Sequence, residues 1–273
     1  MAVAIRFALR RTDDPELGAL ATSTIALVVT ALIGLAVRPS GSLAPADLWP
    51  FLLAGVLAPG SSQILFIRAI REAGAARTAV LMGTAPLVSV AIALVALGEP
   101  LRAPLLVGAA CIVVGVVALA GERVRPADFR RLGAVFAVMA TVLFAVRDNL
   151  LRWLAEGTDA AALVTAPVSL LAGAGTVALY LLASRRRAWA CGYGSALRVF
   201  LPTGVLFGCS YAALFEAYYR GRVTVVAPLV ATESLWGVVF SILLLRRSEL
   251  VGRKLVLGAA LIVAGGALIG ASR

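Results

Sequence analysis

Histidine is absent from this chain of 273 residues, and charged residues make up only 14% of it. A soluble domain of this size carries about 25% charged residues. The chain also lacks a glycine-rich phosphate loop and closely spaced carboxylates in a loop, and its three cysteines have no metal-ligand spacing. The sequence therefore predicts no enzyme, no ATP-driven pump, no cofactor and no metal site.

Long apolar segments take the place of the missing charges. Hydrophobic residues make up 61% of the chain, its mean hydropathy is +0.98, and strand-like alternation is absent. The apolar runs between charged clusters are about 18–25 residues long, the length of a helix that crosses a hydrocarbon core of about 30 Å. We therefore predict an all-α polytopic membrane protein with nine full spans, at about 17–37, 48–69, 75–97, 103–120, 133–154, 160–183, 199–219, 223–245 and 254–271.

The positive charge also fits a membrane protein better than a nucleic-acid-binding protein. The net charge is +11, but the arginines lie singly or in short clusters between apolar runs. Lys and Arg concentrate in cytoplasmic loops, so the alternate loops that hold 18 of the 25 Lys and Arg are expected to be cytoplasmic and the C-terminus outside. The abundance of Arg and Ala suggests a GC-rich bacterial genome, and the expected location of a multi-pass helical protein is then the bacterial cytoplasmic (inner) membrane. The expected partners are the lipid bilayer and a small-molecule substrate, with a homodimer as an open alternative and no nucleic acid.

Two segments of the chain repeat one another. Residues 98–119 and 248–269 align at an offset of 150, which places Gly108 on Gly258 and Gly115 on Gly265. Membrane chains built from two homologous halves usually move a solute between those halves. We predict a first repeat at 1–121, a linker at 122–132 and a second repeat at 133–273.

The first repeat is predicted to lack most of its first helix. Residues 3–6 (VAIR) resemble residues 144–147 (FAVR), which lie late in the fifth span. The chain would then begin in the last turns of a helix whose counterpart is 133–154. A start codon assigned too late, loss of the helix and coincidence are the three explanations.

Glu233 is the clearest candidate for a functional charge. It lies near the middle of the run 223–245, roughly 15 Å from either end of a straight helix. Charged groups inside a bilayer are costly and are functional candidates by default. Pro228 precedes it, and polar or aromatic side chains that could share its cavity lie beside it, at Thr232, Ser234 and Trp236. A structural ion pair is the alternative role for Glu233.

Other charged groups form two further candidates. Arg68 and Glu216 are symmetry mates of opposite charge in the repeat, each about one turn inside a helix end. They would either snorkel to the interface or form an intramembrane ion pair. Arg147, Asp148 and Asn149 would either line the pocket or cap an interface, and Arg147 could pair with Glu233 or Glu216.

Helix-breaking residues recur within the predicted spans. Pro59, Pro86 and Pro228 are expected to interrupt helices that line a cavity. Gln63, which follows the Pro59 break, is a candidate for a polar path. The patterns Gly204-x-x-x-Gly208 and Gly266-x-x-x-Gly270 predict close helix contacts.

The repeated motif resembles the EamA-type transporters of the drug/metabolite transporter superfamily. It combines a turn ending in glutamate with a glycine-rich apolar helix, and alanines lie near helix ends before it. The residues that carry this resemblance are Leu97-Gly98-Glu99 with Gly108 and Gly115, Glu249 with Gly258 and Gly265, and Ala69 and Ala217.

The resemblance implies ten helices in two inverted five-helix repeats and a central cavity. It also implies a secondary exporter or exchanger of a small organic solute such as an amino acid, metabolite or drug. The chain departs from the family pattern in its nearly absent first helix, in Arg247-Ser248-Glu249 at the second turn, and in its external C-terminus. A non-transporting pseudo-transporter and a flippase for a lipid-linked intermediate are the alternatives.

Overall fold

The computed structural model of the chain is all-helical in the part that it describes. It describes residues 1–12, 14–96, 103–120, 130–184, 189–221, 226, 229–230, 232–245 and 252–271, and these contain no strand. Large apolar side chains lie open on the helices, with Leu35 71%, Val117 64% and Leu179 67% exposed. Apolar faces of this kind suit a lipid environment.

Helix length supports the same conclusion. Five helices among the described residues are long and apolar enough to cross a membrane, so the chain is a multi-pass membrane protein, whereas the count of nine spans remains a prediction. The five are Pro15–Val37, Pro45–Ala73, Arg131–Glu156, Ala162–Ala183 and Gly192–Arg220.

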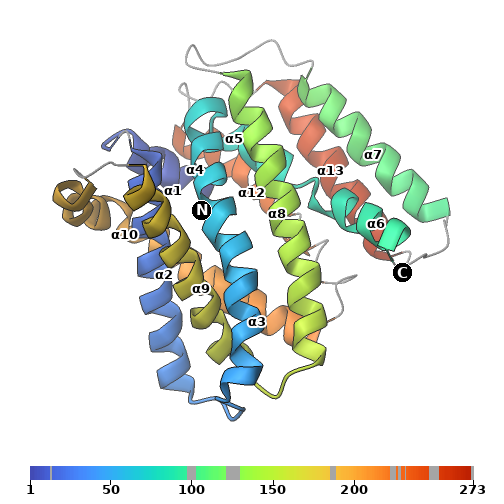
Figure 1. The fold of residues 1–273 in the computed structure, drawn as a ribbon. Coiled ribbons are helices and arrows are strands. Elements are labelled where there is room, and N and C mark those ends of the chain that lie inside the picture. The colour runs from blue at the N-terminus through green and yellow to red at the C-terminus, as the bar shows by residue number, and fades with distance from the viewer. Residues whose placement is uncertain are drawn as a thin grey trace. The chain divides into compact units, whose positions relative to one another are not determined.

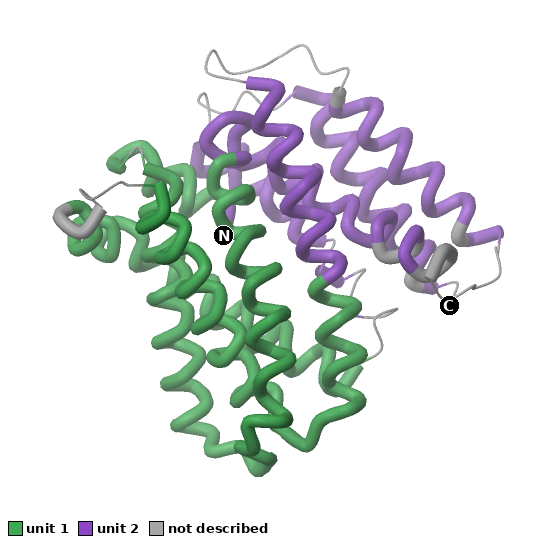
Figure 2. The backbone as a smooth tube through the Cα atoms, viewed as in Figure 1, with its two compact units in different colours: residues 1, 3–68, 147–221 green, residues 2, 69–146, 222–273 purple. Residues whose placement is uncertain are grey.

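The chain forms two compact units, each of which takes residues from both predicted repeats (Figure 2). Unit 1 contains residues 1, 3–68 and 147–221, and unit 2 contains residue 2 together with 69–146 and 222–273. Two long helices, α4 (Ser62–Ala73) and α8 (Arg131–Glu156), contribute to both units.

Unit 1 contains the long helices α2, α9 and α10, which Figure 1 shows. Gly204 and Gly208 of α10 lie against Ile25 and Val29 of α2, as the glycine spacing predicted, and the two helices run parallel because these contacts advance together. The elements of this unit, besides its shares of α4 and α8, are α1 (Ala2–Leu9), α2 (Pro15–Val37), α3 (Pro45–Gly55), η1 (Val56–Ser61), α9 (Ala162–Ala183) and α10 (Trp189–Arg220).

Local sequence explains where the unit 1 helices begin and break. Asp14 caps α2 by accepting a hydrogen bond from the Leu17 amide at 3.1 Å, and Pro15 occupies the first turn, where its missing N–H is not needed. The predicted break at Pro59 is present: Ala58 has non-helical φ and ψ of −148° and 119°. This break leaves the Ala58 carbonyl available to a side chain.

Unit 2 has an apolar core around two antiparallel helices, α7 and α13. A methyl group on Gly108 would lie 2.6 Å from the Gly265 carbonyl oxygen, and one on Gly115 would lie 2.8 Å from that of Gly258. The backbones approach so closely because these four positions lack side chains. The elements of this unit are α5 (Ala75–Met82), α6 (Ala85–Ala96), α7 (Ala103–Ala120), α12 (Glu233–Phe240), η2 (Ser241–Leu245) and α13 (Arg253–Ala271).

Two helix boundaries differ from the sequence prediction. The span predicted at 75–97 is two helices, because the chain turns at Gly83 and Thr84, and Pro86 then lies in the first turn of α6. The helix expected to begin near residue 199 begins at Trp189. In α13 the close contacts with α7 are at Gly258 and Gly265, and the contact predicted from Gly266-x-x-x-Gly270 stays a prediction.

Candidate functional site

Unit 1 buries an ion pair between Arg147 and Asp148 of α8. The Arg147 Nε lies 2.8 Å from the Asp148 Oδ1, and the two side chains are only 4% and 10% exposed. Neighbouring helical residues point about 100° apart, so the long Arg147 side chain must bend back to reach the carboxylate. Burying both charges is tolerated because each compensates the other.

Tyr211 of α10 connects this ion pair to the helix break. The Arg147 guanidinium lies 5.1 Å from the centre of the Tyr211 ring, within the range of a cation–π interaction. The Tyr211 hydroxyl donates to the Ala58 carbonyl at 3.3 Å and lies 3.0 Å from the Ser169 Oγ. Because the tyrosine uses its one proton on the carbonyl, the serine donates to the tyrosine. Tyr211 therefore donates a hydrogen bond to the carbonyl that the break exposes, and its ring makes a cation–π contact with Arg147.

Aromatic side chains line α10 on both sides of Tyr211. The ring centres of Phe207 and Tyr211 are 5.4 Å apart, and those of Tyr211 and Phe215 are 4.7 Å apart. Tyr218 is also fully buried and interacts electrostatically with Asp148 and Arg147. These rings shield the ion pair from lipid. The four-residue spacing of Phe207, Tyr211 and Phe215 places their rings on one face of α10, and this spacing is the sequence signal for the aromatic face.

The interior of unit 1 also contains polar side chains without protein partners. Thr22, Ser23, Ser62, Gln63 and Thr203 are at most 1% exposed, and their side-chain polar atoms have no hydrogen-bond partner within the described part of the chain. Each buried, unpaired polar group costs about 1–3 kcal/mol of folding free energy. Buried polar groups normally bind water or another molecule when protein atoms do not satisfy them. The interior of unit 1 therefore has groups that can bind a polar ligand.

The candidates around Glu233 belong to unit 2. Glu233 is the first residue of α12 and its side chain is exposed in the structure, while Thr232 precedes it and donates to the Leu229 carbonyl at 2.6 Å. Ser234 is buried next to Gly83, and Trp236 is 56% exposed and stacks on Phe240. Pro228 lies outside the described residues. The structure thus brings Arg147 and Asp148 together in one unit, with Asn149 and Gln63 also in that unit, and groups Glu233 with its neighbours in the other.

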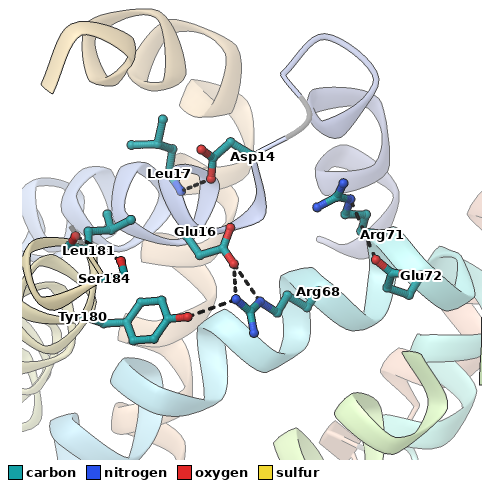
Figure 3. A network of polar contacts seen from close by, with 9 residues as sticks. All are labelled: Asp14, Glu16, Leu17, Arg68, Arg71, Glu72, Tyr180, Leu181 and Ser184. Atoms are coloured by element: carbon teal, nitrogen blue, oxygen red, sulfur yellow. Dashed lines mark hydrogen bonds and ion pairs between the residues drawn. The ribbon is translucent and has the colours of Figure 1, made fainter. Parts of the chain in front are cut away.

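Of the two alternatives for Arg68 and Glu216, the structure does not contain the ion pair between them. Arg68 binds Glu16 at the start of α2 and also donates to the Tyr180 hydroxyl at 3.1 Å, as Figure 3 shows. Glu216 accepts from Arg220 at 2.7 Å, one turn further along α10. Arg68 pairs with a residue of another helix, whereas Glu216 pairs within its own helix. Arg68 therefore ties α4 to α2 and α9 inside unit 1.

Comparison with known proteins gives a partial family match. Residues 1–121 match the model of the EamA-like transporter family, over the same residues as the predicted first repeat. A search of curated proteins found no match.

A solved crystal structure has the same fold. It is described only as "Crystal structure of protein", and it superimposes with a TM-score of 0.67 over 98% of this chain and 93% of its own, at 21% identity. At this identity the likeness concerns the fold alone. The family match and the apolar helices point to a transporter in a membrane.

Proposed function

We propose that the chain is an EamA-type secondary transporter that exports or exchanges a small organic solute, such as an amino acid, metabolite or drug. It would act in the bacterial cytoplasmic membrane by alternating access between two inverted repeats. The family match of residues 1–121 and the shared fold support this proposal.

The contact between α7 and α13 supports the inverted repeat. At the sequence offset of 150, Gly108 corresponds to Gly258 and Gly115 to Gly265. If each glycine is replaced by its equivalent in the other repeat, the contact between Gly108 and Gly265 becomes a contact between Gly258 and Gly115. The structure contains both contacts. Two antiparallel helices related in this way share a twofold axis perpendicular to their length. For helices that span a bilayer, such an axis lies in the membrane plane.

The buried Arg147–Asp148 pair is the observation that carries the proposal. Ionisable groups within membrane spans mark the paths of ions and solutes more often than they serve packing. Here the pair lies in the same unit as the unpartnered buried polar side chains and beside a helix that breaks at Pro59. A solute with hydrogen-bonding groups would find donors and acceptors there that the fold leaves unused.

Glu233 is proposed to couple transport to a proton or another ion. Its carboxylate has no ion-pair partner among the described residues, and Glu233 is the first residue of α12. A carboxylate at such a site can bind and release a proton as its exposure changes. Coupling through Glu233 predicts that a pH gradient drives uptake in the wild-type protein and not in Glu233→Gln.

Uptake into proteoliposomes tests the proposal. A panel of labelled amino acids, metabolites and drugs is screened with and without a pH gradient, using the wild-type protein and Arg147→Gln/Asp148→Asn. We expect at least one solute to accumulate, and the neutral double variant to lose most of this uptake although it keeps its fold. Arg220→Gln is the matched control, since the Arg220 side chain is 82% exposed and pairs only locally. Wild-type uptake by the neutral double variant would contradict the assigned role of the pair.

A further inference from the structure

A pocket in unit 1 lies between the start of α3 and the end of α8. Its volume is about 570 Å³, within the range of small-molecule sites. Its lining includes two tryptophans, a phenylalanine, two carboxylic acids and a threonine: Trp49, Trp153, Phe51, Asp47, Glu156 and Thr158. The chain has only four tryptophans and 14 acidic residues, so this lining holds half of its tryptophans together with two of its carboxylates.

The pocket wall combines aromatic surface with negative charge. Trp49 and Trp153 are 56% and 69% exposed, so their rings are accessible from outside the fold. Aromatic faces and a carboxylate together recognise organic ammonium groups, because the ring quadrupole and the anion both attract a weakly hydrated cation. Tryptophans alone are common where helices leave a bilayer, and the carboxylates distinguish this pocket from such an anchor.

Asp47 supplies the negative charge that remains available. Glu156 is bound to Arg152 at 2.7 Å, so its charge is largely compensated. Asp47 lies in the first turn of α3, and its carboxylate has no ion-pair or hydrogen-bond partner within the described part of the chain. A cation in the pocket would therefore pair with Asp47.

The rim of the pocket is held in place by bonds between two connecting segments. The Ser42 amide donates to the Asp159 carbonyl at 2.9 Å, and the Thr158 hydroxyl lies 3.5 Å from the Asp47 carbonyl that accepts its proton. A methyl group on Gly41 would lie 2.7 Å from the Ala161 amide nitrogen, so the two segments are in close contact. A pocket whose rim is fixed before binding loses less entropy when a ligand enters.

The wall also connects to the buried polar groups of the unit. Phe51 stacks on Tyr219 with 6.4 Å between ring centres, and the Tyr219 hydroxyl lies 2.9 Å from the Thr165 Oγ1. Thr165 is one turn from Ser169 on α9, which bonds Tyr211. Stacked rings and two hydroxyl pairs on α9 and α10 therefore lie between the pocket wall and Tyr211, whose ring faces Arg147.

We propose that this pocket binds organic ammonium cations between Trp49 and Trp153, with Asp47 as the counter-charge. The site goes beyond the transport proposal and does not depend on it, because binding at the pocket requires no movement of a solute across the membrane. The other two tryptophans of the chain are at positions 189 and 236; Trp236 is not among the residues that line the pocket.

Choline and its uncharged isostere 3,3-dimethylbutan-1-ol provide the test. In the purified full-length Trp189→Phe/Trp236→Phe protein, only the two pocket tryptophans report by fluorescence. We expect choline to change their emission saturably and the isostere to have no such effect. Asp47→Asn should raise the half-saturating choline concentration at least about tenfold, which corresponds to about 1.4 kcal/mol.

Glu216→Gln is the matched carboxylate control, because it lies in the same unit and does not line the pocket. Equal responses to choline and the isostere, or an unchanged half-saturation in Asp47→Asn, would overturn the proposal. If the double tryptophan variant does not fold, equilibrium dialysis of labelled choline compares the choline affinities of the wild-type and Asp47→Asn proteins and tests the same proposal. Failure of the transport assay with intact choline binding would affect only the transport proposal.

Discussion

The two units bury different chemistry in their interiors. Unit 1 encloses the Arg147–Asp148 pair and several polar side chains that have no protein partner within the described part of the chain. The core cluster of unit 2 consists of Ala, Val, Leu and Ile side chains. Its buried Thr78 and Thr141 bond to carbonyls of their own helices, and in the described part of unit 2 only the Ser241 hydroxyl is left unpaired.

This difference indicates that the interior of unit 2 serves packing, whereas the interior of unit 1 serves function. Unpaired buried polar groups reduce stability, so a fold that keeps many of them in one region and few in another is expected to use that region. Unit 2 gains cohesion from close backbone contact. Unit 1 gives up part of its stability for a polar interior.

The largest effect is expected from neutralising one side of the ion pair. Arg147→Gln should lower the free energy of unfolding by about 3–5 kcal/mol, because it leaves the Asp148 carboxylate buried without its partner. Arg147→Gln/Asp148→Asn should recover most of this loss. Thermal unfolding in detergent measures both. If Arg147→Gln were as stable as the wild-type protein, water would have to reach the Asp148 carboxylate in the interior of unit 1.

Unit 2 should instead be sensitive to added volume. Gly265→Leu is expected to cost about 1–3 kcal/mol, because its side chain would displace the Gly108 backbone and Ile112. The exposed neighbour Ala264→Leu is the control on the same helix and should change unfolding little. Similar melting temperatures for the two variants would remove the argument that close contact holds unit 2 together.

Removing the Tyr211 hydroxyl should have a moderate effect. Tyr211→Phe keeps the ring beside Arg147 but leaves the Ala58 carbonyl and Ser169 without their partner, which should cost about 1–2 kcal/mol. Tyr180→Phe, at a tyrosine that is 40% exposed, should cost less. Calorimetric or fluorescence-detected unfolding of the two variants distinguishes a buried hydroxyl bond from an exposed one.

The smallest effect is expected at Gln63, where the sign of the stability change decides between two interpretations. Gln63→Leu removes an unpaired buried amide, so stability should stay the same or rise by up to about 1 kcal/mol, while solute uptake falls. Thr141→Val in unit 2 removes a hydroxyl that is bonded at 2.8 Å to Ala137 and should lower stability slightly. A clear loss of stability in Gln63→Leu would mean that the amide is satisfied by bound water.

Much of the architecture follows from periodicity and composition. Apolar runs locate the long helices, and Pro59 locates the break, because a residue without an N–H cannot continue the helical hydrogen-bond pattern. The turn at Gly83 and Thr84 was missed because the run around it stays apolar. Hydropathy reports burial in lipid and not the path of the backbone.

The charged contacts were harder to predict. The repeat placed Arg68 opposite Glu216 in sequence, but the side chain reaches Glu16, which lies 52 residues away along the chain. Sequence identifies which charges lie in spans, whereas the choice of partner depends on how helices pack. The role of Tyr211 could not be predicted from the sequence, since its bond to the Ala58 carbonyl exists only once α10 packs beside the break.

The glycines of α7 and α13 carry a consequence for the history of the chain. Each helix presents two glycines seven residues apart, and the same two positions meet their equivalents in reverse order. One ancestral helix would have been sufficient to form the entire seam by pairing with a second copy of itself. Fusing two such copies into one gene would have preserved the seam unchanged.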